Sequence, residues 1–134
     1  MFETVLEEAP HLGCEVDVHW VQRGGCNPIW AIEKAAGNLD LLHLKDYRIK
    51  PITPELFAGE NGMMNFFREY FPNCVEFAEI GEGNLNWPAI IEAGLEAGSK
   101  YLIVEQDTTY GRDEYESLKS SAEYLKKIGY ADCF

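Results

Sequence analysis

Apolar segments of strand length alternate with amphipathic segments along the whole chain. Four of them, at residues 13–21, 40–46, 74–80 and 100–106, are rich in β-branched, aromatic or leucine residues and are bounded by turn residues, which is typical of β-strands. A polar loop and then a helical segment follow each of them. Because strands that alternate with helices form parallel sheets with right-handed crossovers, the pattern predicts a single α/β domain over residues 1–134.

The predicted helices have recognisable boundaries. Three of them begin at an asparagine or aspartate that can cap the first turn, and each ends before a glycine. The pairs of boundary residues are Asn27 and Gly37, Asn86 and Gly98, and Asp113 and Gly129. Residues 3–9, which Pro10 follows, have the pattern of the last part of an earlier helix.

Residues 47–73 form a longer segment between the second and third predicted strands. It contains a cluster of aromatic residues, Phe66, Phe67, Tyr70 and Phe71, and we expect one short helix at about residues 63–71. A connection of this length usually covers a binding site or a partner surface, although a well-packed excursion with neither role fits the sequence nearly as well.

The chain is strongly acidic, with 23 acidic against 11 basic residues and a net charge of −12. Because a surface this negative repels phosphodiester backbones, the composition argues against nucleic acid as a partner. No apolar run approaches the ~20 residues that cross a bilayer, and the first residues lack the features of a signal peptide, so we expect no membrane association and a cytoplasmic location. The four cysteines are widely spaced, which argues against a disulfide framework or a zinc site built from Cys-x-x-Cys pairs.

Ionisable side chains gather at the carboxyl ends of the predicted strands, where the active groups of parallel α/β sheets lie. They are Asp17 with His19, His43 with Lys45, Glu79, and Glu105. Each alone has an ordinary explanation as a solvated, capping or structural residue. Together, a carboxylate, an imidazole and a second carboxylate from neighbouring strands form a mixed oxygen and nitrogen site that suits Mn²⁺, Mg²⁺, Co²⁺ or Zn²⁺. The position of Glu105 beside an apolar strand is costly unless a cation or another partner meets it.

Four motifs in the chain resemble those of the sugar phosphate isomerase/epimerase family, the xylose-isomerase-like (β/α)8 barrels. They are VDVHWVQRGG at residues 16–25, LHLKD at 42–46, EIGEGNLNW at 79–87 and VEQD at 104–107. The resemblance covers nearly the whole chain but matches only the carboxyl-terminal half of such a barrel, strands five to eight. It therefore implies half of a (β/α)8 TIM barrel, with four parallel strands each followed by a helix and completed by a second chain.

The resemblance also implies a set of metal ligands. In this family a divalent metal is held by Glu, Asp, His and Glu from strands four, five, six and eight. Asp17, His43 and Glu105 match the last three of these ligands, and Glu105 is also the candidate catalytic carboxylate. The strand-four glutamate would precede residue 1. Trp20 stands where some ketose epimerases of the family have a substrate-contacting histidine, a departure that argues against their particular substrates.

Six residues are candidates for contacts with a substrate. They are His19, Trp20, Lys45, Glu79, Glu82 and Arg112. Lys45 shares strand parity with His43, and it either contacts a substrate oxygen or phosphate or lies on the surface. Glu82 belongs to a glycine-containing turn before a helix, where backbone N–H groups meet anionic or hydroxyl-rich ligands.

The activity that the resemblance implies is metal-assisted isomerisation between an aldose and a ketose, or epimerisation next to a carbonyl, of a sugar or sugar phosphate. The metal polarises neighbouring sugar oxygens while a carboxylate moves the proton. The alternative is a non-catalytic half-barrel, a fragment or an assembly subunit of a split or truncated isomerase. Because a half-barrel leaves unpaired apolar edges at residues 14–20 and 100–106, we expect either a homodimer that closes an eight-stranded ring or a complementing amino-terminal half.

Overall fold

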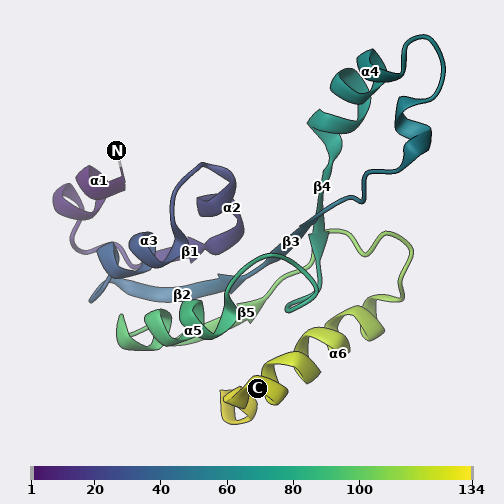
Figure 1. Ribbon diagram of the computed structural model, residues 1–134. Helices are drawn as coiled ribbons and strands as arrows, with labels where there is room; N and C mark the ends of the chain where they lie inside the picture. The colour runs from purple at the N-terminus through teal and green to yellow at the C-terminus, as the bar shows by residue number, and fades with distance from the viewer. Residues whose placement is uncertain (1, 134) are drawn as a thin grey trace.

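A three-stranded parallel sheet lies at the centre of the molecule in the computed structural model, which describes residues 2–133 (Figure 1). Its strands are β1 (Cys14–Asp17), β2 (Leu39–Leu44) and β5 (Tyr101–Val104), in the order β1-β2-β5. In this register Asp17 lies opposite His43, and His43 lies opposite Ile103 on the other neighbouring strand. The sheet therefore places the ends of β1, β2 and β5 next to one another.

One face of this sheet is covered and the other is open. Leu42 and Leu44 of β2 are fully buried in the core with Val16 of β1, against helices α3 (Pro28–Lys34) and α5 (Trp87–Glu96). Because side chains alternate along a strand, the intervening residues lie on the opposite face. There Tyr101 and Ile103 remain exposed, so this face has no covering layer among residues 2–133.

The third predicted strand does not join this sheet, and the prediction of a half-barrel is wrong. Residues 75–78 form β4 (Val75–Ala78), which pairs antiparallel with β3 (Asp46–Ile49) in a separate two-stranded sheet. The chain passes from β2 into β3 after a single residue, Lys45, and β4 returns along it as the second strand of a long hairpin. The place beside β2 is taken by β5, so residues 2–133 do not form four parallel strands each followed by a helix.

The first predicted strand is also too long. It ends at Asp17, and residues 18–23 form a short helix, α2 (Val18–Arg23). The cause is local, because an Asp17 side-chain oxygen accepts a hydrogen bond from the backbone N–H of Trp20 at 3.0 Å and caps the first turn. His19 and Trp20 therefore lie on a helix and not on a strand.

The three predicted helices are confirmed as α3, α5 and α6 (Glu114–Leu125), but only two of the three predicted caps are, because the Asn86 side chain makes no capping hydrogen bond to α5. Asn27 accepts a hydrogen bond from the Ile29 N–H at 2.8 Å, and Asp113 caps α6 in the same way. Gly37, after α3, has a φ of 87°, a conformation that favours glycine. The helix expected at residues 3–9 is α1 (Phe2–Glu8), and after α6 the chain continues through η4 (Lys126–Tyr130) and η5 (Ala131–Cys133).

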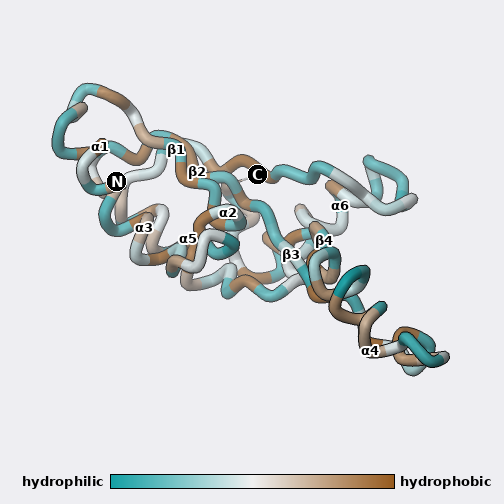
Figure 2. Tube along the Cα trace, turned by 90° about the horizontal axis from the view of Figure 1, so that it is seen from above, coloured by the Kyte–Doolittle hydropathy of each residue, from teal (hydrophilic) through white to brown (hydrophobic). Residues whose placement is uncertain are grey.

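The segment between β3 and β4 projects away from the sheet (Figures 1 and 2). We call residues 50–74 the arm. It contains a 3₁₀ turn, η1 (Pro54–Phe57), helix α4 (Gly62–Asn65) and two further turns, η2 (Phe66–Tyr70) and η3 (Phe71–Asn73). The expected short helix at about residues 63–71 is confirmed by α4 and the turns that continue it. Among residues 2–133, no helix combines the length and apolarity that crossing a membrane requires.

Candidate metal centre

Three side chains from the three parallel strands meet at the ends of those strands. Asp17 is the last residue of β1, His43 lies opposite it on β2, and Glu105 directly follows β5. The Glu105 N–H donates to the Leu44 carbonyl at 3.1 Å, which keeps this residue in register with β2. One possible ligand atom from each of Asp17, His43 and Glu105 lies within 4.8 Å of the other two.

The imidazole of His43 is held between carboxylates on both of its nitrogens. Its Nδ1 lies 2.7 Å from a Glu105 oxygen and 3.9 Å from an Asp17 oxygen, whereas Nε2 lies 3.4 Å from a Glu15 oxygen. The 2.7 Å contact between Nδ1 and Glu105 needs a proton on Nδ1, and if a cation took the place of that proton, the protonated Nε2 would face Glu15. Glu15 would then orient the ring in the way that second-layer carboxylates orient metal-binding histidines. Sequence reasoning missed Glu15, although it shares strand parity with Asp17.

Lys45 places a buried ammonium beside the same carboxylates. Its Nζ lies 2.8 Å from Asp107, 3.2 Å from Glu105 and 3.8 Å from Asp17, and its side chain is almost fully buried. Burial alone would lower the pKa of Lys45, but hydrogen bonds to Asp107 and Glu105 outweigh burial and raise it. Lys45 therefore points into the centre as a cation and does not lie on the surface.

The group as a whole carries an excess of negative charge. It contains one ammonium, that of Lys45, and four carboxylates, those of Glu15, Asp17, Glu105 and Asp107, so the net charge is −3 when His43 is neutral. A divalent cation would offset most of this excess. The donor set of two carboxylates and one imidazole suits the ions that bind through oxygen and nitrogen.

No protein-family model matches this chain, and no curated protein shows a significant match. The resemblance of its motifs to the sugar phosphate isomerases stays a prediction.

His19 and Trp20 form part of an aromatic wall beside the centre. His19 is buried and packs against the rings of Trp20, Tyr47 and Phe77 at centroid distances of 4.8, 5.6 and 5.0 Å. Burial lowers the pKa of His19, and its Nδ1 has no hydrogen-bond partner among residues 2–133. The Lys45 ammonium lies 5.7 Å from the Trp20 ring centroid and 5.3 Å from that of Phe77, within the range of cation–π attraction.

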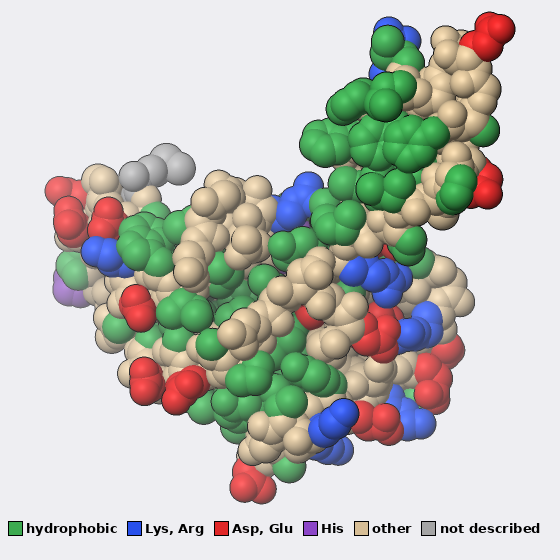
Figure 3. Space-filling model, in the orientation of Figure 1, with side chains coloured by type: hydrophobic (Ala, Val, Ile, Leu, Met, Phe, Trp, Pro, Cys, Tyr) green, Lys and Arg blue, Asp and Glu red, His purple; other side chains and the backbone are tan. Residues whose placement is uncertain are grey.

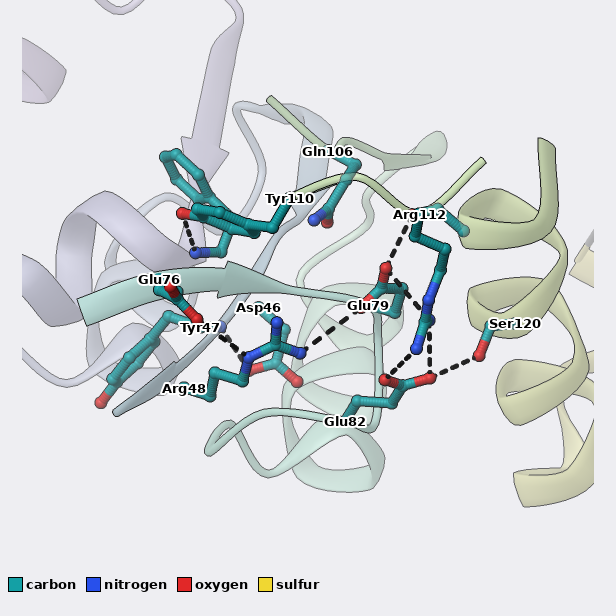
Figure 4. Close-up of polar contacts among 12 residues, drawn as sticks. Asp46, Tyr47, Arg48, Glu76, Glu79, Glu82, Gln106, Tyr110, Arg112 and Ser120 are labelled. Atoms are coloured by element: carbon teal, nitrogen blue, oxygen red, sulfur yellow. Dashed lines mark hydrogen bonds and ion pairs between the residues drawn. The ribbon is translucent and has the colours of Figure 1, made fainter. Parts of the chain in front are cut away.

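The other three candidate residues form a second cluster, at the end of β4 and on the loop before α6 (Figure 4). Arg112 forms a bidentate pair with Glu82 at 3.0 Å and contacts the buried Glu79 at 3.0 Å. Ser117 donates to Glu79 and Ser120 donates to Glu82, and the pairing with Arg112 lowers the pKa of Glu82. Within residues 2–133, no hydrogen bond or ion pair joins this cluster to the Asp17–His43–Glu105 group, so the two groups form separate polar networks.

A hollow lies beside the loop that follows β5. It has a volume of about 430 Å³, and residues 106–111 and the first turn of α6 line most of it. Asp107, which pairs with Lys45, is one of the lining residues. Because its walls carry carboxamide, carboxylate and hydroxyl groups, the hollow suits a small hydroxylated ligand.

Proposed function

We propose that this chain provides the metal- and substrate-binding part of a divalent-metal-dependent sugar or sugar phosphate isomerase or epimerase. The observation that carries the proposal is the convergence of Asp17, His43 and Glu105 from three adjacent strands. The resemblance of residues 16–25, 42–46, 79–87 and 104–107 to that family supports it. The net negative charge around the three side chains supports the binding of a cation, such as Mn²⁺, Mg²⁺, Co²⁺ or Zn²⁺.

Asp17, His43 and Glu105 would hold the ion, and when bound it polarises the oxygens of a sugar next to the carbon that loses its proton. Glu105 is held by both of its oxygens, one near His43 and the other near Lys45. This fixes the carboxylate that we assign to proton transfer. The rings of Trp20 and Phe77 lie against the Lys45 ammonium.

The family's strand-four glutamate has no counterpart in the matched motifs, so we propose that the remaining ligand comes from outside residues 1–134, from a complementing amino-terminal half. In that assembly this chain supplies three ligands and the polar hollow beside the loop that follows β5. The competing function is that of a non-catalytic subunit, and activity of the assembled protein distinguishes the two.

Metal titration tests the proposed centre directly. Wild-type protein should bind Mn²⁺ by isothermal titration calorimetry, and Asp17→Asn, His43→Gln and Glu105→Gln should each weaken binding by about tenfold or more. Asp113→Asn is the matched control, because Asp113 is an exposed helix cap that contacts none of the three. The same affinity in wild type and in all three ligand variants would overturn the metal centre.

Exchange of a carbon-bound proton tests the chemistry. With Mn²⁺ and the complementing half present, ketoses or ketose phosphates in D₂O should gain deuterium at the carbon next to the carbonyl, observed by proton NMR. Glu105→Gln should abolish this exchange. Metal binding without exchange on any sugar of the panel would instead favour the non-catalytic subunit.

A further inference from the structure

The arm carries a patch of exposed apolar side chains, which Figure 3 shows on the projecting lobe of the molecule. The patch consists of six side chains that are between 41% and 61% exposed: Ile52, Phe57, Met63, Met64, Phe67 and Phe71. Fully extended aromatic residues expose roughly 150–250 Å² each, so the patch presents on the order of 600 Å² of apolar surface. This is at the upper limit of the largest apolar patch on a typical monomer, about 300–600 Å².

The patch rests on an ordered support. Phe66 stacks on Phe57 at a centroid distance of 5.1 Å and on Tyr70 at 5.2 Å. The buried Tyr70 donates a hydrogen bond from its hydroxyl to the Lys50 carbonyl, which joins η2 to the first residue of the arm. The exposed side chains therefore stand on a small core of their own, which reduces the entropy cost of ordering them at an interface.

The arm is less acidic than the rest of the chain. The arm contains two basic residues, Lys50 and Arg68, and three acidic residues, Glu55, Glu60 and Glu69. Its net charge is therefore −1, whereas the whole chain carries −12. Two copies of so acidic a chain repel each other least where this nearly neutral surface meets itself.

We propose that the arm is a dimerisation element, and that its apolar patch packs against the same patch of a second copy of this chain. A two-fold contact pairs a surface with itself, which requires a surface that is apolar and close to neutral. A standard interface buries about 800 Å² per partner, and the patch supplies most of that area. The contact differs from a pairing of the sheet edges β1 and β5, and it does not depend on the proposed chemistry.

Dimerisation through the arm would also act on the hairpin that supports it. The arm joins β3 to β4, and β4 carries Phe77, whose ring packs on His19 and on Lys45. A second copy bound at the patch would therefore restrict the motion of the strand that forms part of the wall beside Glu105.

Sedimentation velocity of the full chain over a concentration series tests the proposal. Wild-type protein should change from its monomer mass of 15.2 kDa to twice that mass as the concentration rises. Phe67→Glu should weaken dimerisation by about 30-fold or more, because a central aromatic residue of an interface is lost and two like charges are brought together. Tyr115→Glu is the matched control, since Tyr115 is an even more exposed aromatic residue on α6 and should leave the dimer unchanged.

A second substitution separates loss of the interface from loss of the arm's fold. Met63→Lys changes a side chain that is 61% exposed, so it should weaken dimerisation while leaving the far-ultraviolet circular dichroism spectrum of the monomer unchanged. A monomer at every concentration would overturn the proposal, and so would equal dimerisation by wild type, Phe67→Glu and Met63→Lys. Association only after addition of a separate amino-terminal half would assign the patch to that chain instead.

Discussion

Asp46 offers the sharpest test of how the hairpin is joined to the rest of the molecule. Its side chain is fully buried at the start of β3, and its two oxygens accept five hydrogen bonds at 2.7–3.2 Å. The donors are the backbone N–H groups of Tyr47, Gly81, Asn84 and Leu85 and the indole N–H of Trp87. This single carboxylate therefore holds the loop after β4 and the first residue of α5.

The substitution Asp46→Asn keeps the shape of the side chain and replaces one acceptor by a donor. If the amide nitrogen takes the place of Oδ2, the Gly81 N–H and the Trp87 indole lose their acceptor, and the opposite orientation removes three bonds. Hydrogen bonds to a charged group contribute about 1.5–3 kcal/mol each, so two lost bonds cost about 3–6 kcal/mol. That is a large fraction of the free energy of unfolding of a typical domain, about 5–15 kcal/mol.

Urea unfolding followed by circular dichroism measures this loss. Asp113→Asn is the control, because asparagine caps a helix as well as aspartate does and the free energy of unfolding should change by less than about 0.5 kcal/mol. If Asp46→Asn lost no more than the control, the five bonds would not hold the loop in the way that the geometry indicates.

Three other substitutions test separate features. Gly62→Ala should lower the free energy of unfolding, measured with urea, by about 1–3 kcal/mol, because a Cβ at this position would meet the backbone of Phe57. An unchanged free energy of unfolding would refute this close packing at the start of α4. Burial lowers the pKa of His19 below its usual value, so below about pH 6.5 the unfolded chain binds the extra proton first and stability falls as the pH falls. The melting temperature of His19→Phe should therefore decline less than that of wild type between about pH 7 and pH 5, and parallel curves would contradict this. Lys45→Met should lower the melting temperature of the metal-free protein, because the ammonium that offsets Glu105 is removed. For the same reason, addition of Mn²⁺ should raise the melting temperature of this variant more than that of wild type. An equal rise in both proteins would show that Lys45 does not compete with the cation.

The helices were predictable from sequence because residues next to their ends determine where they begin and end. Asn27 and Asp113 bind the first turn of their own helices, and no distant residue is needed for this. The same local chemistry explains the error after β1, where an apolar stretch with strand composition becomes α2 because Asp17 caps it. There the cap determined the structure, and the side-chain composition did not.

The pairing of β4 could not be predicted from the pattern of the chain. Residues 75–78 have the composition of a buried parallel strand, yet their partner is β3, a segment that the sequence pattern assigns to a loop. Strand composition indicates that a segment pairs but not which segment it pairs with. The predicted meeting of Asp17, His43 and Glu105 did not depend on β4, because β1, β2 and β5 are adjacent in the observed sheet. That part of the reasoning needed only neighbouring parallel strands that end at one edge.

Lys45 connects the candidate centre with β4, the strand whose pairing was wrongly predicted. This residue is the single link between β2 and β3, and its ammonium lies between the ring of Phe77 on β4 and the carboxylates at the ends of β1 and β5. If β4 were a further parallel strand, Phe77 would not be carried back across β3 to cover that ammonium. The hairpin therefore buries the lysine, and the buried lysine holds Asp17 and Glu105 close to His43 by neutralising part of their charge. A cation at these carboxylates would compete with Lys45, so under the proposed function the geometry of the hairpin would limit the affinity for a metal.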